Sequence, residues 1–348
     1  MNRGGWATTL LASWQRPQPD ALARMLQPLA WLYRALSGAR RALYRSGLRA
    51  GQRAPQPLIV VGNLLAGGAG KTPTVIALVE LLRALGYTPG VVSRGHGRRD
   101  SAMRIVDASS PADEVGDEPL LVHLRTGSPV AVAARRIDAA RALCQAHAEI
   151  DVLVSDDGLQ HLALARDAQL IVFDERGAGN GLLLPAGPLR EPLPRQLPER
   201  TLVLYNSPGP STALPGFVIH RSLAGVVELS GWWQGKRADA QGWQALRGRR
   251  LLACAGTAVP QRFFSMLQAQ GLTFDALPLP DHADYGRLPW PGDAGDVVVT
   301  EKDAVKIRPD RVGRTQVWVA PLDFHLDDAV GHQLGLWLPP PRRTGHDP

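Results

Sequence analysis

Short apolar runs alternate with segments of helical periodicity through most of this 348-residue chain. The runs are four or five residues long, and such runs are typical of buried strands. They lie at residues 58–61, 90–93, 151–155, 169–173 and 201–205. Residues 72–85 and 130–147, which fall between these runs, have the spacing of helices. The alternation predicts a parallel, doubly wound α/β sheet.

A proline-rich stretch at residues 207–215 interrupts this alternation, and a second α/β pattern begins near residue 250. Two α/β domains are also what the length of the chain favours. We predict an arm at residues 1–54, a first domain at 55–215, a second domain at 216–338 and a disordered tail at 339–348. The junction between the two domains is expected somewhere within residues 207–248.

The arm differs from the rest of the chain in charge. The whole chain has a net charge of +7, but residues 1–57 contain nine arginines and a single acid, Asp20, so they carry +8 and leave the remainder at −1. A basic arm of this kind is typical of binding to nucleic acid or to an anionic membrane surface.

Apolar residues in the arm recur at steps of three and four, which on a helix places them in one stripe. They are Leu22, Met25, Leu26, Leu29, Leu32, Tyr33 and Leu36. A basic amphipathic helix suits the plane of a membrane interface, whereas the alternative is a helix that packs on its own domain with its arginines in solvent. The charge asymmetry and the tryptophans at 6, 14 and 31 favour the membrane.

Two further features concern the compartment. No run of 18 or more apolar residues is present, so no transmembrane helix is predicted. Only two cysteines occur, Cys144 and Cys254, which is no disulfide framework and suits a reducing cytoplasm.

The segment Gly62–Thr72, with the sequence GNLLAGGAGKT, lies between a predicted strand and a predicted helix, which is the setting of a phosphate-binding loop. We expect Lys71 to reach the β- and γ-phosphates of ATP, and Thr72 to bind Mg²⁺ through its hydroxyl. Leu65 stands where the strict pattern has glycine, so the loop is a variant phosphate loop. It predicts that the first domain is P-loop NTPase-like. An ordinary glycine-rich turn is the disfavoured alternative. The expected nucleotide-binding residues are Gly67, Gly68, Ala69, Gly70, Lys71, Thr72 and Pro73.

Acidic residues offer candidate metal ligands and proton acceptors. Asp156 and Asp157 end a predicted strand, and carboxylates in such a place beside a phosphate loop commonly hold Mg²⁺, although Asp-Asp-Gly also initiates turns. Asp117 and the polar cluster 281–285, which includes His282, lie far apart in sequence. An Asp–His pair can accept the proton of a hydroxyl nucleophile, but spacing alone leaves open whether these two meet.

Several of these segments, taken together, resemble the tetraacyldisaccharide 4′-kinases of lipid A synthesis. The matching stretches are Val61–Pro73, Ser93–Arg98, Val115–Pro119, Ser155–His161, Leu184–Pro192, Pro280–His282 and Thr300–Lys306. They follow the family's order, and the combination is far more specific than any single motif. The chain departs from the family pattern at Leu65, Ala69, His96, Ala283 and 256–259. Of these, Leu65 can donate no side-chain hydrogen bond to a phosphate.

The resemblance implies a reaction and a place. It implies transfer of the γ-phosphoryl group of ATP, with Mg²⁺, to the 4′-hydroxyl of a tetraacylated glucosamine disaccharide 1-phosphate. It also implies two α/β domains preceded by an amphipathic helix, and peripheral or monotopic attachment to the cytoplasmic face of the inner membrane. The partners expected are therefore the acylated disaccharide substrate and the membrane lipid surface.

The resemblance also implies roles for individual residues. Asp117 corresponds to the catalytic base and His282 to its partner, and both act with Lys71. The acids of the Mg²⁺–ATP site correspond to Asp156, Asp157 and Glu191. Contacts with phosphate or substrate are assigned to Arg94, Arg98 and His161.

Two other functions fit parts of the sequence. A regulatory ATPase or GTPase is compatible with the loop, but no Asn-Lys-x-Asp motif for guanine is present. A nucleic-acid-binding protein would use the basic arm, yet the body is nearly neutral and no recognition motif appears. We therefore predict neither a nucleic-acid partner nor a protein partner.

Overall fold

The computed structural model describes residues 3–281 and 283–342, and its contacts group the chain into two compact units. Unit 1 comprises Met1–Val92, Arg136–His220 and Leu326–Pro348, and unit 2 comprises Ser93–Arg135 and Arg221–His325. The sequence-based division used one continuous segment per domain. It differs from this grouping because residues 93–135 belong with unit 2 and the last helix belongs with unit 1.

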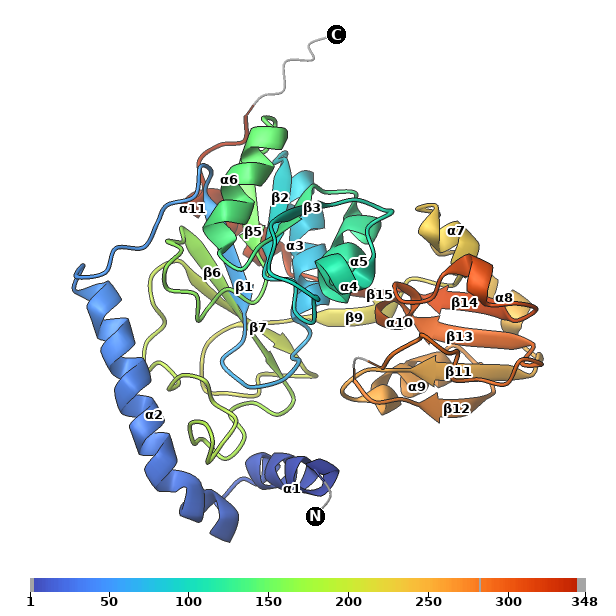
Figure 1. The fold of residues 1–348 in the computed structure, drawn as a ribbon, viewed down its shortest axis with the longest axis horizontal. Helices are drawn as coiled ribbons and strands as arrows, with labels where there is room; N and C mark the ends of the chain where they lie inside the picture. The colour runs from blue at the N-terminus through green and yellow to red at the C-terminus, as the bar shows by residue number, and fades with distance from the viewer. Residues whose placement is uncertain (1–2, 282, 343–348) are drawn as a thin grey trace. The chain divides into compact units, whose positions relative to one another are not determined.

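A sheet of parallel strands forms the centre of unit 1, as predicted (Figure 1). The strands of this sheet that belong to unit 1 run in the order β2-β5-β1-β6-β7-β8. Their bounds are Leu58–Gly62 for β1, Pro89–Ser93 for β2, Val152–Ser155 for β5, Ala168–Asp174 for β6, Thr201–Asn206 for β7 and Phe217–Val218 for β8. Every residue of β1, β2, β5 and β7 is buried, as expected for a parallel sheet covered on both faces. Because the strands are parallel, the loops after β1, β5, β6 and β7 leave the same edge of the sheet.

Apart from the arm, the described part of unit 1 contains the helices α3 (Lys71–Ala84), α6 (Arg136–Ala146) and α11 (Asp328–Trp337). After α11 the chain stays on unit 1, since the Tyr87 hydroxyl donates to the carbonyl of Pro339 at 2.8 Å and the Arg342 N–H donates to Asp151 at 3.0 Å. Residues 339–342 are therefore held in place, which differs from the disordered tail that we expected; the rest of that tail, 343–348, lies outside the described residues.

The arm consists of α1 (Arg3–Gln15) and α2 (Ala21–Arg45) (Figure 1). Asp20 caps α2 by accepting from the Ala23 N–H at 2.9 Å. The helix continues through Pro28. Part of its predicted apolar stripe is exposed, with exposed fractions of 66% at Met25, 53% at Leu29, 57% at Leu32 and 64% at Leu36. The other stripe residues, Leu22, Leu26 and Tyr33, are half-buried. In the described part of the chain, no helix combines the length and the apolar character that a membrane crossing requires.

Unit 2 contains a five-stranded sheet in the order β10-β14-β13-β11-β12, in which only β10 is antiparallel to its neighbour. The bounds are Val227–Glu228 for β10, Leu251–Ala255 for β11, Phe274–Pro278 for β12, Asp296–Thr300 for β13 and Gln316–Ala320 for β14. The strands β3 (Arg104–Val106) and β4 (Val130–Val132) are antiparallel neighbours in the eight-stranded sheet. A separate two-stranded sheet consists of β9 (His220–Leu223) and β15 (Leu322–His325). The core beside the large sheet includes Leu246, Ala253, Phe264, Leu267 and Val298.

The helices of unit 2 are α4 (Ala112–Val115), α5 (Asp117–Thr126), α7 (Leu229–Trp233), α8 (Gly242–Leu246), α9 (Pro260–Ala269) and α10 (Glu301–Ala304), with a 3₁₀ turn at Pro309–Arg311. A buried ion pair ties α5 to α10, since Arg125 Nη1 donates to Glu301 Oε1 at 3.0 Å. Trp232 Nε1 donates to the same oxygen at 3.0 Å, and Arg125 also pairs with Asp323. Burial raises the pKa of Glu301 even though Arg125 opposes the shift. The pair therefore holds in place the helix that begins at Asp117.

Candidate active site

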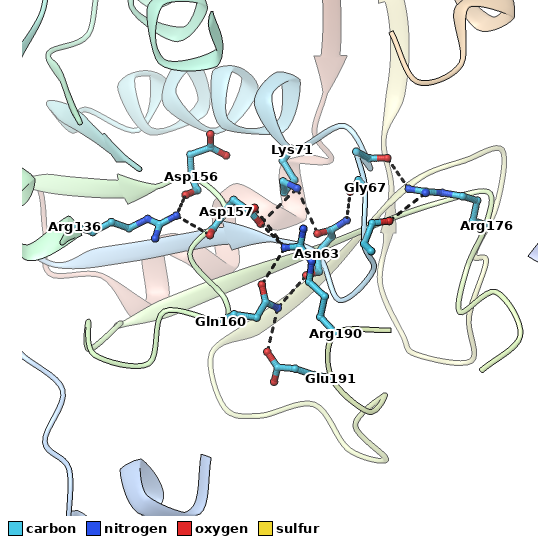
Figure 2. Close-up of polar contacts among 12 residues, drawn as sticks. Asn63, Gly67, Lys71, Arg136, Asp156, Asp157, Gln160, Arg176, Arg190 and Glu191 are labelled. Carbon is cyan, nitrogen blue, oxygen red and sulfur yellow. Dashed lines mark hydrogen bonds and ion pairs between the residues drawn. The ribbon is translucent and has the colours of Figure 1, made fainter. Parts of the chain in front are cut away.

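Side chains hold the loop between β1 and α3 by donating hydrogen bonds to its carbonyl groups. Asn63 Nδ2 donates to the carbonyl of Gly67 at 3.0 Å, and Arg176 Nη2 donates to that of Gly68 at 2.6 Å (Figure 2). Asn206 Nδ2 donates to the carbonyl of Ala69 at 3.2 Å. Gly67 and Gly70 take positive φ angles of 92° and 87°, which glycine adopts without strain. Because carbonyl oxygens would repel a phosphate, fastening them to side chains favours a loop that receives phosphate on its N–H groups.

Lys71 opens α3 and points back over this loop. Its Nζ lies 3.4 Å from Asn63 Oδ1 and 3.4 Å from Asp157 Oδ1, and its side chain is 11% exposed (Figure 2). The N-terminal end of a helix carries a partial positive charge, so the helix and the lysine attract an anion to the same place.

Asp156 and Asp157 follow β5, as the sequence predicts, and Arg136 fixes the turn that carries them. Arg136 Nη2 donates to the carbonyl of Asp156 at 3.0 Å and to that of Asp157 at 2.8 Å. Asp157 has a φ of 45°, which costs energy for a residue other than glycine and is a feature that clusters at functional sites.

The charge of Asp157 is stabilised by its neighbours. Burial by itself would raise the pKa of Asp157, but the cations of Lys71, Arg190 and Arg136 outweigh this and hold the pKa below its usual value. Arg190 Nη1 lies 3.3 Å from Asp157 Oδ1. The carboxylate is therefore ionised at neutral pH.

Glu191 joins the same network through Gln160. Gln160 Nε2 donates to Glu191 Oε1 at 3.1 Å, and Gln160 Oε1 accepts from Arg190 Nη1 at 3.2 Å (Figure 2). Of the predicted acids, the structure thus connects Asp157 and Glu191, whereas the carboxylate of Asp156 points away from that of Asp157 in Figure 2.

The oxygen donors beside the phosphate loop are of the kind that Mg²⁺ takes. No group of three or more His, Cys, Asp and Glu side chains within the described residues could hold a metal ion. Magnesium is usually held by one or two carboxylates together with phosphate oxygens and water, and Thr72, Asp156, Asp157 and Glu191 can supply oxygens of this kind. Thr72 and Asp156 are both buried, at 8% and 3% exposed.

Asp117 belongs to unit 2 and is the first residue of α5, where the positive end of the helix stabilises a carboxylate. Lys306 lies in its electrostatic surroundings. Burial lowers the pKa of Lys306, while the carboxylates of Asp303 and Asp117 act to raise it. Lys306 Nζ donates to the carbonyl of Ala283 at 2.9 Å, and Lys302 pairs with Asp281 at 2.6 Å. His282, the predicted partner of Asp117, lies outside the described residues.

The three predicted substrate residues fall in both units. The Arg98 guanidinium binds nearby backbone carbonyls: Nε donates to the carbonyl of Arg94 at 3.1 Å, and Nη1 donates to that of Ala102 at 2.6 Å. Arg94 is exposed in unit 2, and His161 lies in the turn that follows Asp157 in unit 1. Their substrate role stays a prediction.

Several site residues were not predicted from the sequence. Three of them lie inside stretches that match the family, although neither the motif nor the resemblance gives these residues a role: Asn63, Gln160 and Arg190. Arg176 and Asn206 stand at or just after the carboxyl ends of β6 and β7, the edge at which α/β sheets bind ligands, and this position was the available signal.

The departure from the family pattern at Leu65 has a structural explanation, and so does the glycine that begins the divergent segment 256–259. Leu65 is fully buried and pairs with Leu189 in an antiparallel bridge, so it fills the core beneath the loop. At Gly256 a Cβ would lie 2.6 Å from Asp303 Oδ1, and the Gly256 N–H donates to Asp303 Oδ2 at 3.0 Å.

The glycine-rich loop between a parallel strand and a helix, with Lys71 over it, defines a phosphate-loop protein of the α/β class. The chain matches the family model described as tetraacyldisaccharide-1-P 4′-kinase over residues 22–337, and it therefore belongs to this family of kinases.

Similar proteins agree with this assignment. The tetraacyldisaccharide 4′-kinase of Methylibium petroleiphilum is 54% identical over 343 residues, covering 97% of this chain and 95% of the relative. That of Leptothrix cholodnii is 52% identical over 342 residues, covering 96% of this chain and 98% of the relative. The fold is similar to that of LpxK from Aquifex aeolicus in complex with ATP, with a TM-score of 0.77, 24% identity and coverage of 91% of this chain and 100% of that one.

Proposed function

We propose that this protein transfers the γ-phosphoryl group of ATP to the 4′-hydroxyl of tetraacyldisaccharide 1-phosphate, with Mg²⁺, at the cytoplasmic face of the inner membrane. The observation that carries the proposal is the arrangement of Lys71 and Asp157 at the phosphate loop of a chain that belongs to the 4′-kinase family. The structure of LpxK in complex with ATP supports the choice of nucleotide.

In this reaction the loop and Lys71 bind the phosphates and stabilise the charge that develops on them, which accounts for most of the catalysis in phosphoryl transfer. When bound, Mg²⁺ would offset the negative charge of the phosphates. The residues that would hold it are drawn from Thr72, Asp156, Asp157 and Glu191. Arg136 keeps the Asp156–Asp157 turn in place by its backbone carbonyls.

Asp117 is the proposed base, and His282 is its proposed partner. Asp117 accepts the proton of the 4′-hydroxyl as the sugar oxygen forms its bond to the γ-phosphorus. The bond from that phosphorus to the bridging oxygen of ADP breaks at the opposite side, and ADP leaves with the bonding electrons.

The function is tested by incubating the protein with Mg²⁺, γ-labelled ATP and the acylated disaccharide 1-phosphate in detergent, followed by chromatography of the lipids. We expect label in the lipid and an equal amount of ADP. Consumption of ATP without labelled lipid would contradict the proposal and favour a regulatory ATPase.

The exposed stripe of α2 supports attachment to the membrane. The double variant Leu32→Glu, Leu36→Glu is expected to weaken binding to vesicles of phosphatidylethanolamine and phosphatidylglycerol by at least about 100-fold, because each leucine contributes roughly 1.5–3 kcal/mol when it is buried in apolar surroundings. Cosedimentation measures the affinity. Both side chains are more than half exposed, so the fold is expected to survive.

A matched control is Leu336→Glu on α11, where the leucine is 67% exposed in the same unit. This variant is expected to bind vesicles like the unaltered protein. Equal binding by the double variant and by the control would show that the stripe of α2 is not the membrane contact.

A further inference from the structure

One side of α2, next to its exposed apolar residues, is attached to the rest of unit 1. At 100° per residue, Ala23, Ala30, Tyr33 and Arg41 lie within about 80° of one another, and the exposed residues Met25, Leu29, Leu32 and Leu36 occupy the adjoining arc of the helix. Ala23 and Ala30 are buried. The Tyr33 hydroxyl donates to the carbonyl of Arg190 at 2.9 Å, and Arg41 Nη1 lies 3.6 Å from Glu191 Oε2.

The segment that Tyr33 and Arg41 contact is bonded to the phosphate loop through its backbone. The Arg190 N–H donates to the carbonyl of Leu64 at 2.7 Å, and the Ala66 N–H donates to that of Pro188 at 2.7 Å. The bridge between Leu65 and Leu189 lies between these two bonds. A displacement of residues 188–191 is therefore expected to displace the loop.

Side chains extend the same connection to the phosphate-binding lysine. Glu191 contacts Gln160, Gln160 contacts Arg190, Arg190 contacts Asp157, and Asp157 contacts Lys71, each within 3.4 Å (Figure 2). The Arg41–Glu191 ion pair is partly buried, with side chains 21% and 20% exposed, so solvent screens it less than a surface pair. Arg41 thus begins a continuous series of polar contacts that ends at Lys71.

We propose that Tyr33 and Arg41 are positioning residues for the nucleotide site, through which α2 sets the affinity for Mg²⁺–ATP. Tyr33 fixes the backbone at Arg190, and Arg41 orients the carboxylate of Glu191. The exposed apolar residues and these two positioning residues lie on adjoining parts of the same helix, so α2 links its exposed surface to the nucleotide site. The inference rests on the proposed function of the site.

The test is a comparison of Arg41→Ala with Arg40→Ala in the full-length chain. Arg40 is the adjacent arginine of α2 and is exposed, so both variants lose one positive charge from the same turn. Calorimetry without any lipid acceptor measures the dissociation constant for ATP in the presence and absence of Mg²⁺. Outer-shell partners of metal ligands typically change metal affinity by about 10- to 100-fold, and for this partly buried pair we expect about tenfold.

We expect Arg41→Ala to weaken binding of Mg²⁺–ATP about tenfold and binding of metal-free ATP less than about twofold, while Arg40→Ala changes neither. Arg41→Lys, which keeps the charge, is expected to recover part of the loss. In a Glu191→Gln background Arg41→Ala should have no further effect, since its partner is gone. Tyr33→Phe, which removes a single hydroxyl, is expected to weaken Mg²⁺–ATP binding in the same direction and covers the case in which Arg41→Ala fails to fold.

Equal affinities in Arg41→Ala and Arg40→Ala would overturn the proposal, and so would tighter Mg²⁺–ATP binding in Arg41→Ala, because that would make Arg41 a competitor of the metal. Both of these results leave the lipid-phosphorylation test untouched. Absence of ATP binding in the unaltered protein would instead contradict the proposed function itself.

Discussion

Replacement of Lys71 by alanine is expected to lower the rate of lipid phosphorylation by about 10²–10³-fold or more, the loss typical when one preorganised donor to a developing anion is removed. Lys71 is 11% exposed at the first turn of α3, and its Nζ lies 3.4 Å from Asn63 Oδ1 and from Asp157 Oδ1. Residues 62–72 contain no second cationic side chain that could replace it. The measurement is the turnover number at saturating ATP and acceptor, with label followed into the lipid.

Lys236→Ala is the matched control for this variant. The chain contains only four lysines, and Lys236 is exposed in unit 2. It is expected to retain the activity of the unaltered protein, with the same thermal unfolding midpoint. Substantial lipid phosphorylation by Lys71→Ala would show that the glycine-rich loop is a structural turn rather than the phosphate site.

The parallel sheet of unit 1 could be predicted because buried parallel strands leave a local signal. Strands such as β1 and β5 are covered on both faces and therefore consist of consecutive apolar residues. The grouping of the chain into units left no such signal. Residues 93–135 belong with unit 2 through contacts between residues far apart in sequence, among them the Arg125–Glu301 ion pair, which spans 176 positions.

The candidate site shows the same limit. Lys71 was predictable because its role depends on neighbours within the same motif, and Asp157 because it ends a recognisable strand. Arg176 and Asn206 act instead on carbonyls more than 100 residues away, at Gly68 and Ala69. Only the parallel pairing of β1 with β6, and of β6 with β7, brings these residues to the loop.

The contacts of the arm were missed for a different reason. Sequence periodicity identifies the apolar stripe of α2, but the residues that attach the helix to unit 1 are two alanines, a tyrosine and an arginine. Tyr33 falls within the predicted apolar stripe, and Arg41 is one of the nine arginines of the basic arm. The local sequence pattern thus accounts for both residues and gives no sign of their contacts with residues 190–191.

Asp117→Asn is expected to lower the turnover number by about 10²–10⁴-fold, the usual loss when a general base is removed. Asparagine has nearly the same shape but accepts no proton, so binding of ATP should change little while proton transfer from the 4′-hydroxyl becomes slow. Single-turnover kinetics with labelled ATP and excess acceptor measures the chemical step directly.

Glu118→Gln is the matched control, because Glu118 also lies in the first turn of α5 and loses the same favourable interaction with the positive end of the helix. A general effect of charge at this helix end would slow both variants alike, whereas a specific base slows only Asp117→Asn. If Asp117→Asn keeps near-normal turnover, or if Glu118→Gln is impaired to the same degree, the proton of the sugar hydroxyl must leave by another route, and the phosphate loop alone would account for the catalysis.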